Sequence, residues 1–348
     1  MNQALTPPAT ATPVELPAET RRKVTDLFTR DEIRMLTARS DVMGFWAIGS
    51  TWAVITFALV AMAWASAQPL WLSAPVIVLG LCVIAGRQLC LAILMHDASH
   101  GTLFRTKWLN DTFADWTCAR PIWNDLKKYK VHHFVHHTKT GQPGDTDLSL
   151  VAPFPTTRAS LARKLLRDIT GLTGLKFFAG RFLMDAGFVK WTVANDVVKL
   201  PQDKRTFMNV VTTFLRNATP MLITNGLLFT VLWLSGHAWL FGMWVLAYMT
   251  PFALFVRIRS MAEHACTEKT TDMFRNTRST RAGWLARATV APIHVNYHIE
   301  HHVMASVPYF RLPHMHRLLR QRGAVPEAPG YLDVLRLVST PAPATTHD

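Results

Sequence analysis

Long apolar runs without charge dominate the pattern along this chain. The first covers residues 44–66, and the second, residues 69–95, is interrupted only by Arg87 and Gln88. A third region, residues 218–256, is too long for one membrane crossing and is divided by the polar turn at residues 235–238. A membrane-spanning helix needs about 20 apolar residues at 1.5 Å each. The pattern predicts an all-α integral membrane protein with four transmembrane helices in two hairpins. The alternative is a set of buried helices in a large soluble protein.

Basic residues fill the segments between these runs. Of 37 Lys and Arg residues, 6 precede residue 44, 18 lie between residues 105 and 216, and 12 follow from Arg257 onward. Only Arg87 lies inside a run, and the two predicted hairpin turns carry none. By the positive-inside rule, both termini and the middle segment are expected in the cytosol. We therefore assign the net charge of +14 to a face near anionic lipid headgroups and expect no nucleic-acid partner.

Three regions are expected along the chain. Residues 1–42 are an N-terminal tail with a cytosolic or interfacial segment, and the first twenty have no apolar signal core and are predicted to be disordered. Residues 43–338 form the membrane domain, and residues 339–348 are a disordered C-terminal tail. Within the membrane domain, residues 157–199 alternate basic and apolar positions and predict amphipathic helices at the membrane interface. The four cysteines form no CxxC pair, so neither zinc nor a disulfide is indicated.

Ten of the fifteen histidines fall in or beside three short clusters. The first cluster directly follows the second apolar run, where a continuing helix would place positions i and i+4 on one face. The second and third clusters share the spacing HxxHH, which puts three histidines at i, i+3 and i+4. The eight histidines at these positions are His96, His100, His133, His136, His137, His298, His301 and His302.

Eight imidazoles on one side of one membrane indicate two metal ions. One ion takes only about four to six ligands, and imidazole suits iron, zinc and copper. The zinc-protease pattern HExxH is absent from the sequence. A structural or regulatory metal site is the alternative. His132 lies about 100° from the ligand face of its helix and is expected outside the first ligand layer. His294 lies one turn before the third cluster and is a secondary candidate.

The clusters HDASH (96–100), HFVHH (133–137) and HIEHH (298–302) resemble the three histidine boxes of the membrane fatty-acid desaturase and hydroxylase superfamily. The string NYHIEHHVMASVPYFRLP (296–313) resembles the third box and its downstream segment, and the resemblance covers about residues 45–320. It implies a cytosolic helical cap with two irons held almost wholly by histidine, above a tunnel for an apolar chain. It also implies one more ligand between the last span and the third box. His264 occupies that place, unless it only bonds a carboxylate such as Glu263.

Several polar residues beside the boxes are candidates for supporting the ligands. Asp97 and Glu300 lie off the ligand faces, where a carboxylate can accept the second N–H of a ligating imidazole, although either could be a solvated charge. Asp145 and Asp147 resemble an acidic turn of the superfamily, with a plain surface loop as the alternative. Arg87 is costly in lipid and should face the bundle or reach the interface. The complete set of supporting candidates is His132, Asp97, Glu300, His294 and Asn296.

The resemblance implies chemistry on an unactivated methylene, with O2 and two external electrons used at two irons. The boxes do not separate desaturation from hydroxylation. Asp97 in the first box and the absence of an EHYG-like third motif favour the acyl desaturases over the alkane hydroxylases. We expect an enzyme that introduces a double bond into a long acyl chain of a lipid. A hydroxylase or ketolase of a lipid or carotenoid is the alternative, and a non-enzymatic metal-binding scaffold is a third possibility.

The electron source is expected to be a separate protein. The sequence contains no His-Pro-Gly-Gly haem loop, ferredoxin-like cysteine cluster or dinucleotide fingerprint. A ferredoxin, or a b-type cytochrome with its reductase, is the expected donor. Such acidic proteins would be steered to the basic cytosolic face.

Overall fold

The computed structural model describes residues 23–203 and 205–340, and these residues are helical throughout apart from connecting segments. Within the described part, strand-like pairing is limited to two isolated bridges, Val189 with Lys199 and Arg281 with Gly330. The expected disorder of residues 1–20 and 339–348 falls outside the described residues, except at Ser339 and Thr340, whose backbone N–H groups bond the carbonyls of Arg336 and Leu337 at the end of α15 (Tyr331–Val338). The predicted all-α fold is confirmed.

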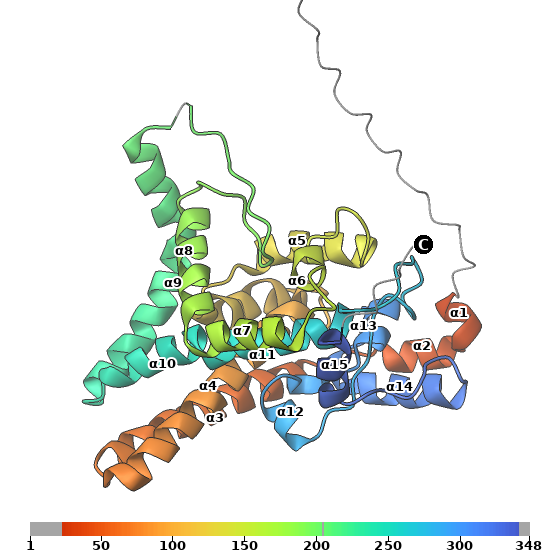
Figure 1. Cartoon of the computed structure of the whole chain (residues 1–348), viewed down its shortest axis with the longest axis horizontal. Coiled ribbons are helices and arrows are strands. Elements are labelled where there is room, and N and C mark those ends of the chain that lie inside the picture. The colour runs from red at the N-terminus through yellow and green to blue at the C-terminus, as the bar shows by residue number, and fades with distance from the viewer. Residues whose placement is uncertain (1–22, 204, 341–348) are drawn as a thin grey trace, which may run out of the picture.

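Four helices are long and apolar enough to cross a membrane, as predicted. The first hairpin joins α3 (Asp41–Ser66) to α4 (Leu70–Ser99), and these two helices pack along each other. The second joins α9 (Phe207–Leu234) to α10 (Trp239–Met249), which is followed at once by α11 (Pro251–His264). Figure 1 shows both hairpin turns at the lower left, away from the shorter helices that form a cap.

The cap is built from the segments before α3, between α4 and α9, and after α11. Most of its shorter helices gather away from the two hairpin turns, and α8 packs beside α9 (Figure 1). Their bounds are α1 Val24–Leu27, α2 Arg30–Leu36, α5 Leu126–Lys139, α6 Leu148–Val151, α7 Arg158–Ile169, α8 Leu172–Asp185, α12 Trp284–Ala288, α13 His298–Val303, α14 Leu312–Gln321 and α15 Tyr331–Val338, with shorter helical turns η1 Leu109–Phe113, η2 Asp115–Ala119, η3 Arg120–Ile122, η4 Pro292–His294 and η5 Tyr309–Arg311.

The third and fourth long helices differ in detail from the apolar pattern. Helix α9 begins at Phe207, well before the apolar run at residue 218, because Thr206 caps its start by accepting the backbone N–H of Asn209 at 3.2 Å. The fourth crossing consists of two helices, since Thr250 has non-helical angles (φ −110°, ψ −88°). Pro251 follows as the first residue of α11, a position where its missing N–H costs no hydrogen bond.

The predicted amphipathic region ends earlier than expected. Helices α7 and α8 account for most of residues 157–185, but the chain leaves the helical conformation after Asp185. Gly187 adopts φ +74°, its N–H bonds the Met184 carbonyl at 3.0 Å, and the next N–H bonds the Leu183 carbonyl at 2.9 Å. A left-handed glycine with these two hydrogen bonds is a common helix C-cap, and here it ends α8. Residues 188–200 therefore form an irregular arm of the cap instead of further helix.

Helix α4 is the central element of the fold, and its inner half is almost completely buried. Gly86 on this helix lets α12 approach so closely that an added Cβ would lie 2.2 Å from the Ala288 carbonyl oxygen. The neighbouring Arg87 donates through Nη2 to that carbonyl at 2.9 Å and to the Arg287 carbonyl at 3.3 Å. Arg87 thus faces the protein and is satisfied by the backbone of α12.

Candidate metal centre

Four helices bring the clustered histidines together. Helix α4 runs directly into the first cluster, and α11 ends at His264. Helix α5 begins after Asp125, whose carboxylate accepts the Lys128 backbone N–H at 2.9 Å, and it carries the second cluster. Helix α13 starts at His298 and carries the third. Histidines from distant parts of the sequence therefore share one layer of the cap.

The nine histidines singled out from the sequence lie in two groups, and within each group the candidate ligand atoms are within 4.8 Å of one another. The first group has five members and the second has four. They are His96, His100, His133, His137 and His301, and then His136, His264, His298 and His302.

The spacing of the ring nitrogens fits shared metal ions. The Nε2 atom of His137 lies 3.0 Å from those of His133 and His301. The Nε2 atom of His264 lies 2.8 Å from that of His298 and 3.2 Å from that of His136. Two ligands at right angles, each with a metal–nitrogen bond of about 2.1 Å, are about 3.0 Å apart.

Further evidence for an ion comes from buried ring nitrogens without partners. The Nε2 atoms of His96 and His100 are buried, and no hydrogen-bond partner for them exists among the residues of the structure that are described. A buried polar atom left unpaired is costly, so a bound cation is the natural partner for two imidazoles placed side by side. The donor set, made of nine imidazoles, fits iron.

Burial keeps the imidazoles in the form that binds metal. Removal from water lowers the pKa of His100 to about 4 and that of His137 to about 2, with neighbouring positive groups adding to the effect. For His133, His301 and His302 the same causes hold the pKa well below its ordinary value. A neutral imidazole has a lone pair that can bind a cation. These rings can therefore bind a metal ion without first losing a proton.

Carboxylates orient two of the rings. His96 donates from Nδ1 to Asp97 Oδ1 at 2.8 Å, and His136 donates from Nδ1 to Asp145 Oδ1 at 2.8 Å. Asp145 is itself fixed, because it accepts the backbone N–H groups of Gly141 and Asp147 at 2.8 and 2.9 Å. Burial alone would lower the pKa of His136, but the Asp145 hydrogen bond opposes it and the net direction is upward. Both contacts leave the Nε2 atom of the ring, in His96 and in His136, free to face the other histidines of its group.

The other supporting candidates play different parts. His132 belongs to neither group and donates from Nε2 to Asp147 Oδ1 at 2.8 Å. Burial raises the pKa of Asp147, but the His132 hydrogen bond and nearby His136 outweigh it and bring the pKa to about 2. Glu300 is fully buried and accepts from His316 Nδ1 at 2.6 Å and from Ser279 Oγ at 2.5 Å.

His294 and Asn296 lie in the turn before α13. Ile293 and His294 both have positive φ, so the η4 turn does not continue into α13 and His294 does not share the ligand face of His298. His294 belongs to neither histidine group. Asn296 donates from Nδ2 to the Thr280 carbonyl at 2.9 Å, which ties this turn to the preceding segment.

Some contacts around the centre were not predicted from the sequence, although Glu263 was considered there as a partner of His264. Arg259 and Glu263 form an ion pair on α11 with Nε to Oε1 at 2.8 Å, and Glu263 Oε1 lies 3.6 Å from His298 Nδ1. Their i, i+4 spacing was a readable signal. Tyr129 stacks on His133 with ring centroids 5.1 Å apart, and His316 holds Glu300 from α14. Nothing local in the sequence marks His316.

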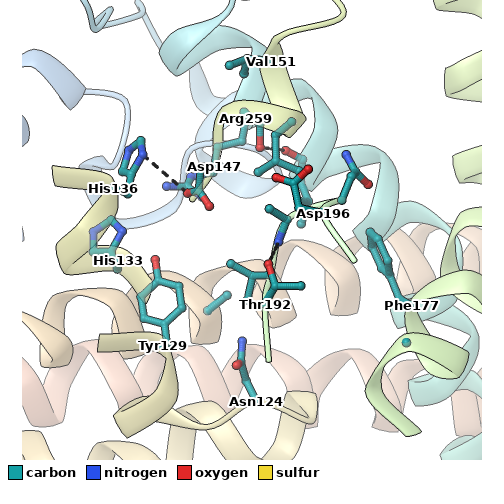
Figure 2. A pocket seen from close by; sticks show the side chains of 18 of the residues that line it. Asn124, Tyr129, His133, His136, Asp147, Val151, Phe177, Thr192, Asp196 and Arg259 are labelled. Atoms are coloured by element: carbon teal, nitrogen blue, oxygen red, sulfur yellow. Dashed lines mark hydrogen bonds and ion pairs between the residues drawn. The ribbon is translucent and has the colours of Figure 1, made fainter. Parts of the chain in front are cut away.

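A cavity of about 230 Å³ opens beside the histidines. His133 and His136 lie at one side of it, above Tyr129 in the view of Figure 2, and His264 and His298 also line it. Much of the remaining wall is apolar and comes from α4, α10 and α11, including Leu89, Ile93, Tyr248, Phe252 and Val256. A carbon chain can therefore lie against the metal centre.

Comparison with known proteins agrees with this geometry. The fatty acid desaturase family matches residues 69–332, a segment that includes all nine histidines of the two groups. The chain belongs to the fatty acid desaturase family and is an oxidoreductase of the desaturase type. It is similar to dihydrorhizobitoxine desaturase of Bradyrhizobium elkanii, with 24% identity over 310 residues that cover 84% of this chain and 78% of the relative.

Proposed function

We propose that this protein is an O2-dependent di-iron desaturase that introduces a double bond into a long acyl chain of a lipid. The observation that carries the proposal is the pair of histidine groups beside a largely apolar cavity. Bound iron would supply the reduction of O2 that removes two hydrogen atoms from adjacent carbons, with two electrons and two protons from outside and two water molecules as the other product.

The proposed ligands follow the two groups. The first iron is assigned to the five-membered group and the second to the four-membered group, with His264 as the ligand outside the three boxes. Asp97 and Asp145 orient two of the rings, which fixes their tautomers and raises their basicity as ligands.

The chain's own contribution to the reaction is positioning. The walls from α4, α10 and α11 hold the saturated segment so that its adjacent methylenes face His133, His136 and His264. Tyr129 closes this side by stacking on His133. An apolar wall also keeps water from the reacting carbons, which suppresses side reactions.

We further propose that the cap, both termini and the metal centre face the cytosol. The distribution of Lys and Arg supports this orientation. Electrons would come from a separate ferredoxin, or from a b-type cytochrome with its reductase, on the basic face of the cap.

Lipid analysis tests the proposed reaction. The protein is expressed in a host of defined lipid content, and total lipids are compared by mass spectrometry with those from a His301→Ala strain. Loss of two hydrogens from an acyl chain, absent in the variant, is the expected result. Gain of one oxygen would instead make the protein a hydroxylase or ketolase. Because the Bradyrhizobium relative is named for dihydrorhizobitoxine, that compound is supplied in a parallel culture.

A further inference from the structure

The cavity beside the metal centre has two chemically different sides. His133 and His136 lie on one, and Phe177 of α8 lies on the other, near Asp196 of the irregular arm (Figure 2). The lining on the α8 side also includes three basic residues, Lys176, Arg181 and Lys190. A pocket built only for a hydrocarbon would have no use for these charges.

Arg181 is the unusual member of this set. Arg181 is only 9% exposed to solvent. Its Nη1 atom is buried and has no hydrogen-bond partner in the described part of the chain. The described carboxylates form no ion pair with it. Asp185, one turn along α8, is instead engaged by the indole N–H of Trp123, with Nε1 to Oδ2 at 2.8 Å.

The neighbours of Arg181 are aromatic. Its guanidinium carbon lies 5.3 Å from the centre of the Trp191 ring, and the guanidinium donates a hydrogen bond to the neutral Tyr248 hydroxyl. An aromatic face attracts a cation, but it neutralises no charge. A guanidinium remains protonated in proteins, so it cannot escape the cost of burial by losing its proton. Burial of a charge without a counter-charge is strongly unfavourable.

The counter-charge can come from a ligand, because Arg181 lines the cavity that leads to the histidines. Carboxylate and phosphate groups match the fork of a guanidinium and form strong charge-assisted hydrogen bonds with it. Lys176 and Lys190 are exposed and add positive charge around the same side. Asp196, an exposed acidic residue, also lines this side.

We propose that Arg181 binds an anionic end group, a carboxylate or a phosphate, of the chain that the enzyme desaturates. The substrate is then an amphiphile with an acidic end at α8 and its saturated segment at the histidines. This choice of substrate rests on the proposed desaturase function, but binding of the end group requires neither iron nor turnover.

Thermal unfolding of the purified full-length protein in a neutral detergent tests the proposal. The probes are octanoate, octyl phosphate and octan-1-ol, which share one chain length and differ in the end group. A ligand that binds the folded state raises the unfolding midpoint. We expect at least one of the two anions to raise the midpoint of the parent protein and the alcohol to have a much smaller effect. The anion with the larger effect identifies the end group.

Variants assign the effect to Arg181. Arg181→Gln is expected to weaken binding of that anion by about tenfold to a hundredfold, because a charge-assisted hydrogen bond is lost. Arg181→Lys keeps the positive charge but lacks the planar, two-pronged guanidinium. Its affinity for the anion should lie between those of Arg181→Gln and the parent protein. Arg163→Gln is the matched control, since Arg163 is an exposed arginine of α7 that does not line the cavity. It should respond to the anions as the parent does.

Two results would overturn the proposal. One is an anion effect that is equal in Arg181→Gln and the parent. The other is that octan-1-ol raises the unfolding midpoint of the parent protein as much as both anions do. This second result would refute the proposal even if both Arg181 variants failed to fold. Neither result touches the desaturase proposal, which depends on the lipid products. Conversely, anion binding with no desaturated product would leave the subsite intact and remove the proposed function.

Discussion

His264 lies where three imidazole nitrogens converge, with Nε2 atoms of His298 and His136 at 2.8 and 3.2 Å. His136 already uses its Nδ1 hydrogen for Asp145, so its neutral form presents a lone pair at Nε2. Burial lowers the pKa of His298 well below its ordinary value, which favours its neutral form with a single N–H. Converging lone pairs repel one another unless a cation lies between them. Because these nitrogens are close enough to share one cation, we propose that His264 is a metal ligand.

Replacement of His264 by glutamine tests this assignment. The change keeps polarity and approximate size but gives a poor iron ligand. We expect His264→Gln to lower bound iron by about one ion per chain and to cut turnover at least about a hundredfold, as His301→Gln should. Iron is measured by elemental analysis of purified protein, and circular dichroism checks the fold. His294→Gln is the control, because His294 lies outside both groups. Iron content and activity of His264→Gln equal to those of this control would show that His264 is no ligand.

Asp145 is predicted to matter through His136. Asp145→Asn keeps the shape of the side chain but replaces a charged acceptor for the His136 Nδ1 hydrogen by a neutral one. Loss of such a partner typically costs about 10- to 100-fold in metal affinity or activity. Iron titration of the metal-free protein measures the affinity. Thr138→Ser, a change at an exposed position of the same helix, is the control. Unchanged iron affinity in Asp145→Asn would contradict the role.

The sequence predictions concern mostly residues that are close along one helix, although the local pair of Arg259 and Glu263 was missed. Spacing of three and four along a helix put His133, His136 and His137 on one face without knowledge of the fold. The contact of Glu300 with His316, by contrast, joins two helices, α13 and α14, whose packing the spacing does not specify. The surroundings of Arg181 could not be predicted for the same reason. Its neighbours, Trp191 of the irregular arm and Tyr248 of α10, are distant in the sequence.

Helix α4 and the short helix α12 meet at a contact that only glycine permits. A Cβ at Gly86 would lie 2.2 Å from the Ala288 carbonyl oxygen, a backbone atom that cannot rotate away. Arg87 bonds the same carbonyl, so the contact is fixed from two positions of α4. Small residues allow this kind of close helix approach in membrane proteins.

Gly86→Ala should therefore destabilise the protein. The added methyl group forces α12 away from α4, and overpacking of this kind costs about 1–3 kcal/mol. Gly226→Ala is the matched control on α9, because nothing lies within 4 Å of its added Cβ. Alanine is the better helix former by up to about 1 kcal/mol, so this variant should be as stable as the parent or more so. Thermal unfolding in detergent gives both values, and equal midpoints for the two variants would refute the close contact.

Element boundaries were predictable where they coincide with a change of hydropathy. The turn at residues 235–238 and the ends of α3 are of this type. The start of α9 is not, because Thr206 begins the helix in a polar stretch before the apolar run. The break at Thr250 lies inside an apolar run, and hydropathy alone does not indicate a change of backbone angles there. Pro251 was a local sign of a helix boundary. The end of α8 depended on the left-handed Gly187.

The whole molecule separates into an apolar end and a charged end. The two hairpin turns lie together at one end, and the cap with the histidine groups lies at the other (Figure 1). Among the described residues, the basic residues outside the long helices belong to the cap, and neither hairpin turn carries one. A bilayer with anionic lipid on its cytosolic leaflet and a membrane potential favours one insertion direction for such a chain. The metal centre would then face the cytosol, where soluble electron donors are present.

Single cysteines at exposed positions test this orientation. Ser66→Cys and Ser235→Cys probe the two hairpin turns, and Thr138→Cys probes the outer face of α5. A membrane-impermeant maleimide added to intact spheroplasts should label the first two above the level of the parent chain, whose own four cysteines set the background. Thr138→Cys should react only after the membrane is permeabilised, because the basic cap is held in the cytosol. Lipid products from each variant show that it is folded. Labelling of Thr138→Cys in intact spheroplasts would reverse the orientation, and opposite results for Ser66→Cys and Ser235→Cys would break the arrangement of two hairpins.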